Sequence, residues 1–129
     1  MGYTWRSDPA KGEWMATAGT IQLPEDLRVA LDQGVGALVQ AADPRLIILF
    51  GSYAEGRANE DSDVDLVVVT ETEDRWKTIG DLRSIVRPYL GDRPLDLLVY
   101  APDRWEEVRH LRGFIPQEAD LYGVRLYEA

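Results

Sequence analysis

Apolar residues follow two different spacings along this chain, and each spacing predicts a different element. Between Leu23 and Pro44 they recur at helical intervals, which predicts a helix that ends at the proline. Short, almost wholly apolar runs are instead typical of strands buried on both faces. These runs span residues 45–50, 64–70 and 95–100, and a last, shorter strand is expected at 124–127.

Further helices are predicted between the strands. Residues 74–90 carry Trp76 and other apolar residues at helical spacing, and Pro102 opens a helix that carries Trp105. We expect both tryptophans to pack on the sheet, and a short turn around 116–122 to lead into the last strand. Strands that alternate with helices predict the α/β (α+β) class, with a small mixed sheet of about four strands flanked by helices.

The first 22 residues differ from the rest, because they show no sustained hydrophobic period. We therefore interpret residues 1–22 as a poorly specified extension that could be flexible, and residues 23–129 as the single folded domain. Met15 is an alternative start of the protein, which the sequence does not distinguish from Met1.

Charge and composition narrow the classes of function. The formal net charge is −9, which does not suit a protein that binds nucleic acid directly, since such proteins need a basic surface. No apolar run is long enough to cross a membrane, and the start of the chain does not look like a secretory signal, so a cytoplasmic location is expected. Cysteine is absent from the sequence, which excludes disulfides and thiolate metal sites.

Three aspartates stand at the starts of apolar strands. Asp63 and Asp65 are two residues apart, so their side chains share one face of a strand. The helix between this strand and the next predicts a parallel crossover, which brings the amino ends of both strands together. We therefore expect Asp96, at the start of the next strand, to lie beside Asp63 and Asp65.

Three carboxylates at one edge of a sheet repel each other, and a divalent cation would relieve that repulsion. Mg²⁺ commonly combines one or two carboxylates with substrate phosphates, and a pair of such ions suits in-line displacement at phosphorus. Exposed aspartates that merely end a strand are the alternative explanation. That alternative suits any one of the three residues better than it suits all three together.

A phosphate-binding turn is predicted just before the aspartates. Gly51 allows a close approach of the backbone to a ligand, and the Ser52 hydroxyl can cap a helix or donate to a phosphate oxygen. We expect the following residues, Tyr-Ala-Glu-Gly, to form a short helix. A Gly-Ser pair alone is a common turn, so its value comes from its spacing to the carboxylates.

The segment GSYAEGRANEDSDVDLVVV resembles the signature of the DNA polymerase β-like nucleotidyltransferases, which is Gly-Ser, ten residues, then Asp-x-Asp. The third aspartate in PLDLLVY and the closing GVRLYEA are similar to the minimal nucleotidyltransferases within that superfamily. The resemblance extends from about Leu23 to Ala129. It implies the polymerase β-like nucleotidyltransferase fold.

The resemblance also implies roles for single residues. Gly51 and Ser52 would hold the triphosphate of ATP. Asp63 and Asp65 would bind Mg²⁺, and Asp96 would bind metal or accept the proton of the attacking hydroxyl. Many relatives carry Ala-Arg-Gly where this chain has Ala-Glu-Gly, so the cationic phosphate contact would pass to Arg57, one residue after the glycine.

The function implied by the resemblance is transfer of AMP from ATP to an acceptor hydroxyl. A chain of 129 residues is expected to hold only the catalytic half, so a partner would present the acceptor. In the resembling group that partner is often a helical HEPN-domain ribonuclease toxin, and AMP is placed on one of its tyrosines. Two alternatives remain: an enzyme that acts on a small hydroxylated molecule with a second subunit, and a non-enzymatic antitoxin that blocks its partner by contact.

Overall fold

A mixed four-stranded sheet lies at the centre of the protein, whose computed structural model describes residues 4–8, 13–17 and 23–129. The strand order is β5-β4-β3-β6, with β4 and β5 parallel and β3 antiparallel to both of its neighbours. The predicted mixed sheet and its parallel pair are thus confirmed. The strands are β3 (Leu46–Phe50), β4 (Val64–Val69), β5 (Leu95–Tyr100) and β6 (Val124–Glu128).

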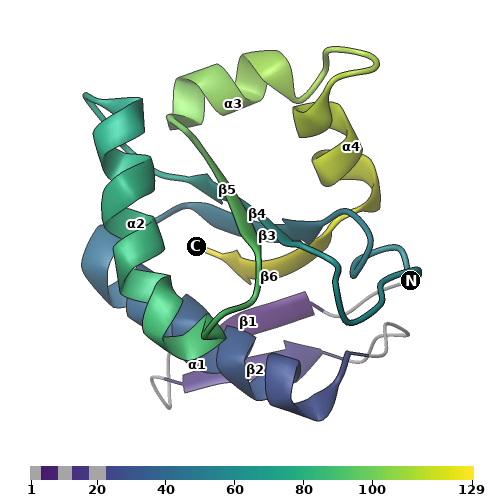
Figure 1. Cartoon of the computed structure of the whole chain (residues 1–129). Coiled ribbons are helices and arrows are strands. Elements are labelled where there is room, and N and C mark those ends of the chain that lie inside the picture. The colour runs from purple at the N-terminus through teal and green to yellow at the C-terminus, as the bar shows by residue number, and fades with distance from the viewer. Residues whose placement is uncertain (1–3, 9–12, 18–22) are drawn as a thin grey trace.

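Helices cover both faces of this sheet (Figure 1), as expected for the α/β class. The two longer helices, α1 and α2, pack on one face, and the two shorter helices, α3 and α4, pack on the other. None of the helices in the described part of the chain is long and apolar enough to span a bilayer. The helices are α1 (Glu25–Ala42), α2 (Arg75–Leu90), α3 (Pro102–Val108) and α4 (Ile115–Tyr122).

The face covered by α1 and α2 holds the larger core. Alternate residues of each strand point into it, because successive side chains of a strand point to opposite faces. Strand β4 is buried along nearly its whole length, since helices lie on both of its faces, and this explains its continuous apolar run. The strand residues of this core include Ile47, Leu49, Val64, Leu66, Val68, Leu97 and Val99.

The described part of the amino-terminal segment forms two strands that the sequence analysis did not predict. Strand β1 (Thr4–Asp8) pairs antiparallel with β2 (Glu13–Thr17) as a separate two-stranded sheet. Strand β1 lies beside β6, and β2 contacts α1 (Figure 1). The division of the chain at residue 22 remains a prediction.

Two predictions about the helices that cover the sheet are wrong. The expected turn around residues 116–122 is helix α4, in which Pro116 occupies the first turn, a position that proline favours. Trp105 is 3% exposed, as predicted, but Trp76 is 75% exposed and does not pack on the sheet. The buried stripe of α2 runs further along the helix, and Trp76 in the first turn lies against the guanidinium of Arg75, 5.3 Å from the ring centre.

Candidate active site

The three aspartates lie at the amino ends of two neighbouring strands. Asp63 directly precedes β4, and Asp65 and Asp96 are the second residues of β4 and β5. The register of the parallel pair places Asp65 directly opposite Asp96. Adjacent strands are about 4.8 Å apart, so the two carboxylates are lateral neighbours. The neighbourhood predicted from the crossover is therefore confirmed.

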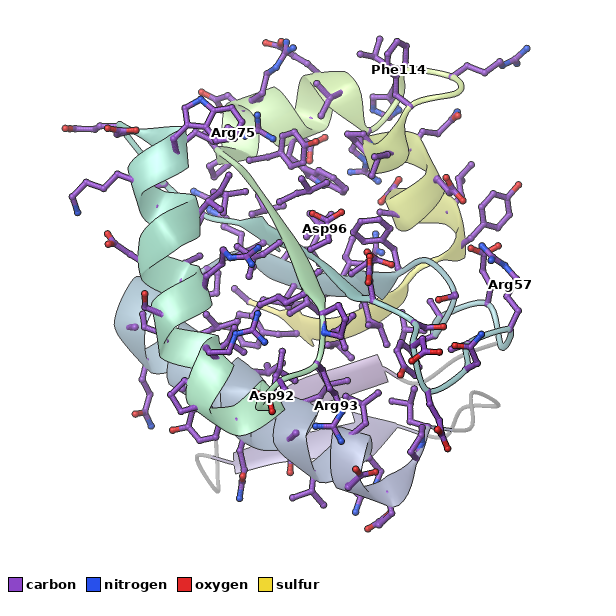
Figure 2. The ribbon with its side chains drawn as sticks, in the orientation of Figure 1. Arg57, Arg75, Asp92, Arg93, Asp96 and Phe114 are labelled. Atoms are coloured by element: carbon purple, nitrogen blue, oxygen red, sulfur yellow. The ribbon has the colours of Figure 1, made fainter. Side chains whose placement is uncertain are left out.

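The carboxylates point to the face that carries α3 and α4. Val64 and Leu66, on either side of Asp65, belong to the core beneath α1 and α2, so Asp65 points the other way. Asp96 alternates with Leu95 and Leu97 in the same manner. Figure 2 shows Asp96 in the space between β5 and α4. The site thus opens on the side of the sheet that the shorter helices cover.

Asp65 is the least exposed of the three carboxylates, whereas Asp63 and Asp96 lie at the surface. Partial burial, together with the nearby negative charges of Asp96 and Asp63, raises the pKa of Asp65 to about 6. Burial and the neighbouring carboxylates both disfavour the ionised form of Asp65, so negative charge is crowded here. A cation at this position would relieve the crowding.

The donor set suits a cation that is shared with a substrate. Among the described residues, no group of three or more carboxylates or imidazoles is arranged to hold a metal ion by itself. Mg²⁺ does not need such a group, since one or two carboxylates commonly hold it together with substrate phosphates and water. Hard carboxylate oxygens at Asp65 and Asp96 therefore fit Mg²⁺ in the presence of a nucleotide better than in its absence.

Gly51 packs directly against the central carboxylate. It follows β3 with a φ of +75°, and a Cβ built on it would overlap Oδ2 of Asp65. Residues with a side chain rarely adopt this backbone conformation. The positive φ and the contact with Asp65 therefore both require glycine. The pairing of Phe50 with Asp65 in the sheet register explains why the turn after β3 lies at the carboxylates.

The short helix predicted after Ser52 is not present. The chain instead makes one hydrogen-bonded turn, in which Glu55 N donates to Gly51 O and Arg57 N donates to Ser52 O, both at 3.0 Å. Gly56 has a φ of +75°, which stops the turn before a helix can continue. Ser52 remains half-buried at the start of this turn, beside Gly51.

A hydrogen-bonded loop positions Asp63, and the sequence analysis did not predict it. Asn59 N donates to Ser62 Oγ at 2.8 Å, and Ser62 N donates back to Asn59 O at 3.1 Å. Asp61 N donates to Asn59 Oδ1 at 2.8 Å, as in an Asx-turn. The hydroxyl of the buried Tyr53 donates to Asn59 O at 3.4 Å, which ties this loop to the Gly51 turn. The signal for it was an asparagine two residues before an aspartate.

Arg57 does not reach the carboxylates in this structure. Its Nη2 atom lies 3.1 Å from Oε2 of Glu55, and its side chain is 64% exposed. Figure 2 shows Arg57 at the outer side of the turn, well away from Asp96. The structure thus brings together Gly51, Ser52, Asp63, Asp65 and Asp96, while a role of Arg57 at the phosphates stays a prediction.

The fold and this arrangement of a glycine turn with strand-borne carboxylates define a nucleotidyltransferase-like protein. The sequence profile of the family described as "Polymerase beta, Nucleotidyltransferase" matches residues 35–111. This span is more than half of the chain and contains the turn and the three aspartates. The chain therefore belongs to this family, and its membership supports nucleotidyl transfer as the class of activity.

Solved structures with similar chains come from toxin–antitoxin pairs. A structure described as a toxin-antitoxin with AMP-PNP is 26% identical, covers 75% of this chain and 73% of its own, and has a TM-score of 0.49. Two mutants of the toxin-antitoxin MntA-HpeT are 26% and 23% identical, with TM-scores of 0.44 and 0.45. They cover 84% and 83% of this chain, and 75% of their own chain in each case. No curated protein matches the sequence.

Proposed function

We propose that this chain catalyses the Mg²⁺-dependent transfer of AMP from ATP to a hydroxyl group of an acceptor. The observation that carries the proposal is the lateral pairing of Asp65 with Asp96, with the Gly51 turn packed directly against Asp65. Displacement at phosphorus needs a phosphate-binding group, a cation site and a proton acceptor in one place. In this proposal the Gly51 turn after β3 binds phosphate, Asp65 on β4 holds the cation and Asp96 on β5 accepts the proton.

The residues of the site have distinct tasks in this proposal. The backbone of the Gly51 turn and the hydroxyl of Ser52 hold the triphosphate of ATP. Asp63, Asp65 and Asp96 would hold Mg²⁺, by one ion or two, together with the phosphates. When bound, the cation neutralises the crowded carboxylates and stabilises the negative charge that develops on the transferring phosphate.

The proposed reaction is an in-line displacement. The oxygen of the acceptor hydroxyl forms a bond to the α-phosphorus of ATP, and the bond from that phosphorus to the oxygen that bridges to the β-phosphate breaks. Pyrophosphate leaves, and AMP stays on the acceptor. The hydroxyl proton passes to a carboxylate, for which Asp96 is placed best, since it is exposed and lies on the edge strand β5, farthest from the Gly51 turn.

We further propose that the acceptor is a tyrosine of a HEPN-domain ribonuclease toxin, so that this chain acts as the antitoxin. This finer proposal rests on the resemblance of the segments around the aspartates and at the carboxyl end to the minimal nucleotidyltransferases. AMP on a tyrosine near a ribonuclease site would add bulk and negative charge, both of which oppose RNA binding. Inactivation would then be covalent and would outlast the complex.

Intact-mass spectrometry tests both levels of this proposal. The chain is incubated with ATP, Mg²⁺ and a candidate toxin, and we expect the toxin to gain the mass of AMP. EDTA or the substitution Asp65→Asn should abolish the gain. If the toxin is inhibited without any gain in mass, and Asp65→Asn inhibits equally well, the protein is a non-enzymatic antitoxin. Release of pyrophosphate with small hydroxylated molecules, but not with the toxin, would instead favour the small-molecule alternative.

A further inference from the structure

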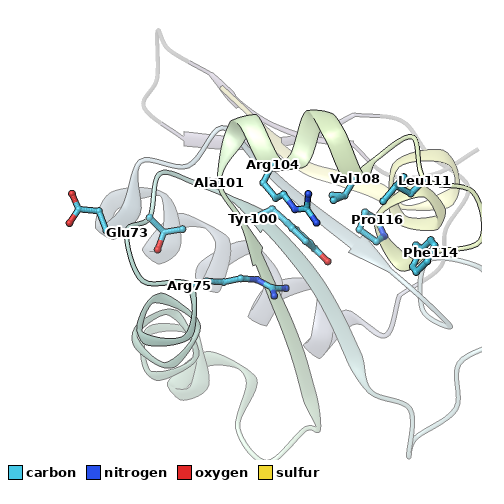
Figure 3. Close-up of a pocket in the computed structure, with 10 residues that line it drawn as sticks. Glu73, Arg75, Tyr100, Ala101, Arg104, Val108, Leu111, Phe114 and Pro116 are labelled. Carbon is cyan, nitrogen blue, oxygen red and sulfur yellow. The ribbon is translucent and has the colours of Figure 1, made fainter.

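A separate hollow lies on the same side of the sheet as Asp96, at the other end of β5 (Figure 3). It encloses about 500 Å³, a volume typical of ligand sites. Tyr100 of β5 lines it, and since Val99 points into the core beneath α1 and α2, Tyr100 shares the face of Asp96. Four residues along a strand separate Asp96 from Tyr100, which corresponds to roughly 13 Å.

One side of this hollow, which we call the Arg75 pocket, is cationic. The Nε atom of Arg75 donates to Val99 O at 2.6 Å, and its guanidinium lies 4.8 Å from the centre of the Tyr100 ring. Glu73 also lines the pocket, but Figure 3 shows its side chain directed away from Arg75, and no carboxylate of the described residues forms an ion pair with this guanidinium. The guanidinium of Arg75 is half-buried, and the N–H groups that Val99 O does not use can donate to an anionic ligand at the pocket.

Two further polar groups face the same space. Figure 3 shows Arg104 on the other side of Tyr100 from Arg75, so that both guanidinium groups and the Tyr100 hydroxyl reach into the pocket. Arg104 forms an exposed pair with Glu107 on its own helix at 2.9 Å, and pairs of this kind contribute little free energy. The Tyr100 hydroxyl has no hydrogen-bond partner among the described residues. All three groups are therefore available to a carboxylate.

The opposite wall of the pocket is apolar and unusually open. Phe114 is 62% exposed and Leu111 is 45% exposed, although both are large apolar side chains. Val108 and Pro116 complete this wall. Exposed aromatic residues beside arginine are typical of the centres of protein interfaces. A ligand that matches both walls carries a negative charge next to an apolar group.

The position of the pocket assigns it to the acceptor rather than to ATP. In the proposed function the triphosphate lies at the Gly51 turn after β3, and the proton is released toward Asp96 on β5. The strand order β5-β4-β3 puts these on opposite sides of Asp65. The Arg75 pocket is built on β5, on the acceptor's side of the site.

We propose that the Arg75 pocket anchors the acceptor protein through a segment that carries a carboxylate next to an apolar side chain, roughly 13 Å from the hydroxyl that receives AMP. This inference rests on the proposed function and adds to it the chemistry by which the acceptor is recognised. The negative charge of the whole chain favours a protein with single acidic residues over a nucleic acid, whose phosphates it would repel.

This proposal is tested by measuring the affinity of matched peptides for the protein, without any transfer of AMP. The probe is a peptide with one tyrosine and, four residues further on, a glutamate followed by a leucine; the controls replace the glutamate by glutamine or the leucine by serine. Affinities are measured by calorimetry in the presence of Mg²⁺ and a non-hydrolysable ATP analogue. We expect the glutamate peptide to bind roughly tenfold more tightly than the glutamine peptide, as for one charge-assisted hydrogen bond.

The protein variants are Arg75→Gln, Arg104→Gln and the control Arg83→Gln. Arg83 is a matched control because it also projects from α2 and caps a carbonyl of β5, with its Nη1 atom 2.9 Å from Leu95 O, but it does not line the pocket. We expect Arg75→Gln and Arg104→Gln to remove the preference for glutamate, and Arg83→Gln to keep it. The melting temperatures of Arg75→Gln and Arg83→Gln show how much stability each variant loses with its hydrogen bond to a carbonyl of β5.

Three outcomes overturn the inference. Equal binding of the glutamate and glutamine peptides, including no binding of either, excludes the carboxylate anchor. Weaker binding of the ATP analogue to Arg75→Gln, with peptide binding unchanged, assigns the pocket to the donor. Tighter binding of a single-stranded RNA than of any peptide assigns it to nucleic acid. Transfer of AMP without a preference for glutamate leaves the proposed function intact, and the preference without transfer refutes that function alone.

Discussion

The two faces of the sheet differ most clearly along β4. Val64, Leu66 and Val68 point toward α1 and α2, and all three are fully buried. On the other face, Val67 and Val69 are buried beneath α3 and α4, but Asp65 at the start of the strand is partly exposed. One face is thus closed along the whole strand, and the other is closed at one end only.

Helix length accounts for this difference. Helices α1 and α2 have 18 and 16 residues, whereas α3 and α4 have 7 and 8. A helix rises about 1.5 Å per residue, so the longer pair spans twice the distance along the sheet. The shorter pair leaves the amino ends of β4 and β5 open on its side. The closed face can therefore stabilise the fold while the open end binds ligands.

The largest expected effect is at Asp65. Asp65→Asn should lower transfer by roughly a thousandfold or more, because a neutral amide is a poor ligand for Mg²⁺ and the metal contributes several kcal/mol to catalysis. The metal-free protein should melt at the same or a higher temperature, since one of three crowded charges is gone. Radiolabelled ATP and thermal melts measure the two effects.

Asp61→Asn is the control for this change, because Asp61 stands two residues before Asp63 in an exposed part of the loop. We expect it to leave transfer and melting temperature unchanged. If Asp65→Asn strongly destabilises the metal-free protein and leaves transfer intact, Asp65 has a structural role and the open end of the sheet is not the active site.

A substitution at Leu66, the residue after Asp65, should instead lower stability and leave transfer almost unchanged. Leu66→Ala removes a fully buried side chain from the closed face, and we expect it to lower the free energy of unfolding by about 3–5 kcal/mol, in the upper part of the range for buried leucines. Transfer per folded molecule should remain within a few-fold of the parent. Urea denaturation measures the free energy of unfolding, and activity at low urea measures transfer per folded molecule. A decrease in the free energy of unfolding below about 1 kcal/mol would contradict a closed core at Leu66.

Ser52→Ala tests the phosphate side of the open end. A single positioned donor to the transferring group contributes about 2.7–4 kcal/mol, so transfer should fall by roughly a hundredfold to a thousandfold. The fold should not change, because the Ser52 hydroxyl makes no hydrogen bond with the described residues. Steady-state rates and a melting curve check both statements. An unchanged rate would reduce Gly51-Ser52 to an ordinary turn.

Gly51→Ala should affect both stability and transfer. Its φ of +75° costs a residue with a side chain about 1–2 kcal/mol, and the new methyl group must displace Oδ2 of Asp65. We expect a lower melting temperature and slower transfer in the same variant. Gly56→Ala is the control, because Gly56 has the same φ but its Cβ would meet open space. Equal loss of transfer in both variants would show that strain, and not the contact with Asp65, is responsible.

Much of the fold was predictable, because its signals are local. The apolar runs at Leu46–Phe50, Val64–Val69 and Leu95–Tyr100 contain no competing pattern, so each was recognised as a strand. Helix α4 was not, since with only 8 residues and a proline at its start it resembles a turn. The strands β1 and β2 were not predicted either, since the segment shows no sustained alternation and the contact of β1 with β6 joins opposite ends of the chain.

The site was predictable to the extent that topology determines it. The helix between β4 and β5 implied parallel strands, and parallel strands placed Asp96 beside Asp65, which the register confirms. The position of Arg57 was not accessible in this way, because its exposed side chain follows its pairing with Glu55 and not a strand register. The Arg75 pocket was also missed. It combines α2, β5 and α3, and no spacing in the sequence connects them.

The smallest expected effect concerns pH. The pKa of Asp65 is raised to about 6, above the value near 3.9 of an unfolded aspartate, so the folded state holds this proton more tightly. The free energy of unfolding of the metal-free protein should therefore fall as the pH rises from about 4 to about 7. The full shift would correspond to about 3 kcal/mol, and solvent screening of a partly exposed group reduces this to roughly 1 kcal/mol.

Subtraction isolates this contribution from that of the other acidic residues. Asp65→Asn lacks the titrating group, so the difference in unfolding free energy between parent and variant, measured in EDTA at several pH values, should change in this interval and be constant outside it. With Mg²⁺ and an ATP analogue, the pH dependence has the opposite sign, because the cation binds only the deprotonated carboxylate. The stabilisation of the parent by these ligands should grow as the pH rises through 6. If the stabilities of parent and variant change in parallel with pH, Asp65 is neither crowded nor buried. The difference between the closed and open faces of the sheet would then not affect the charge of Asp65.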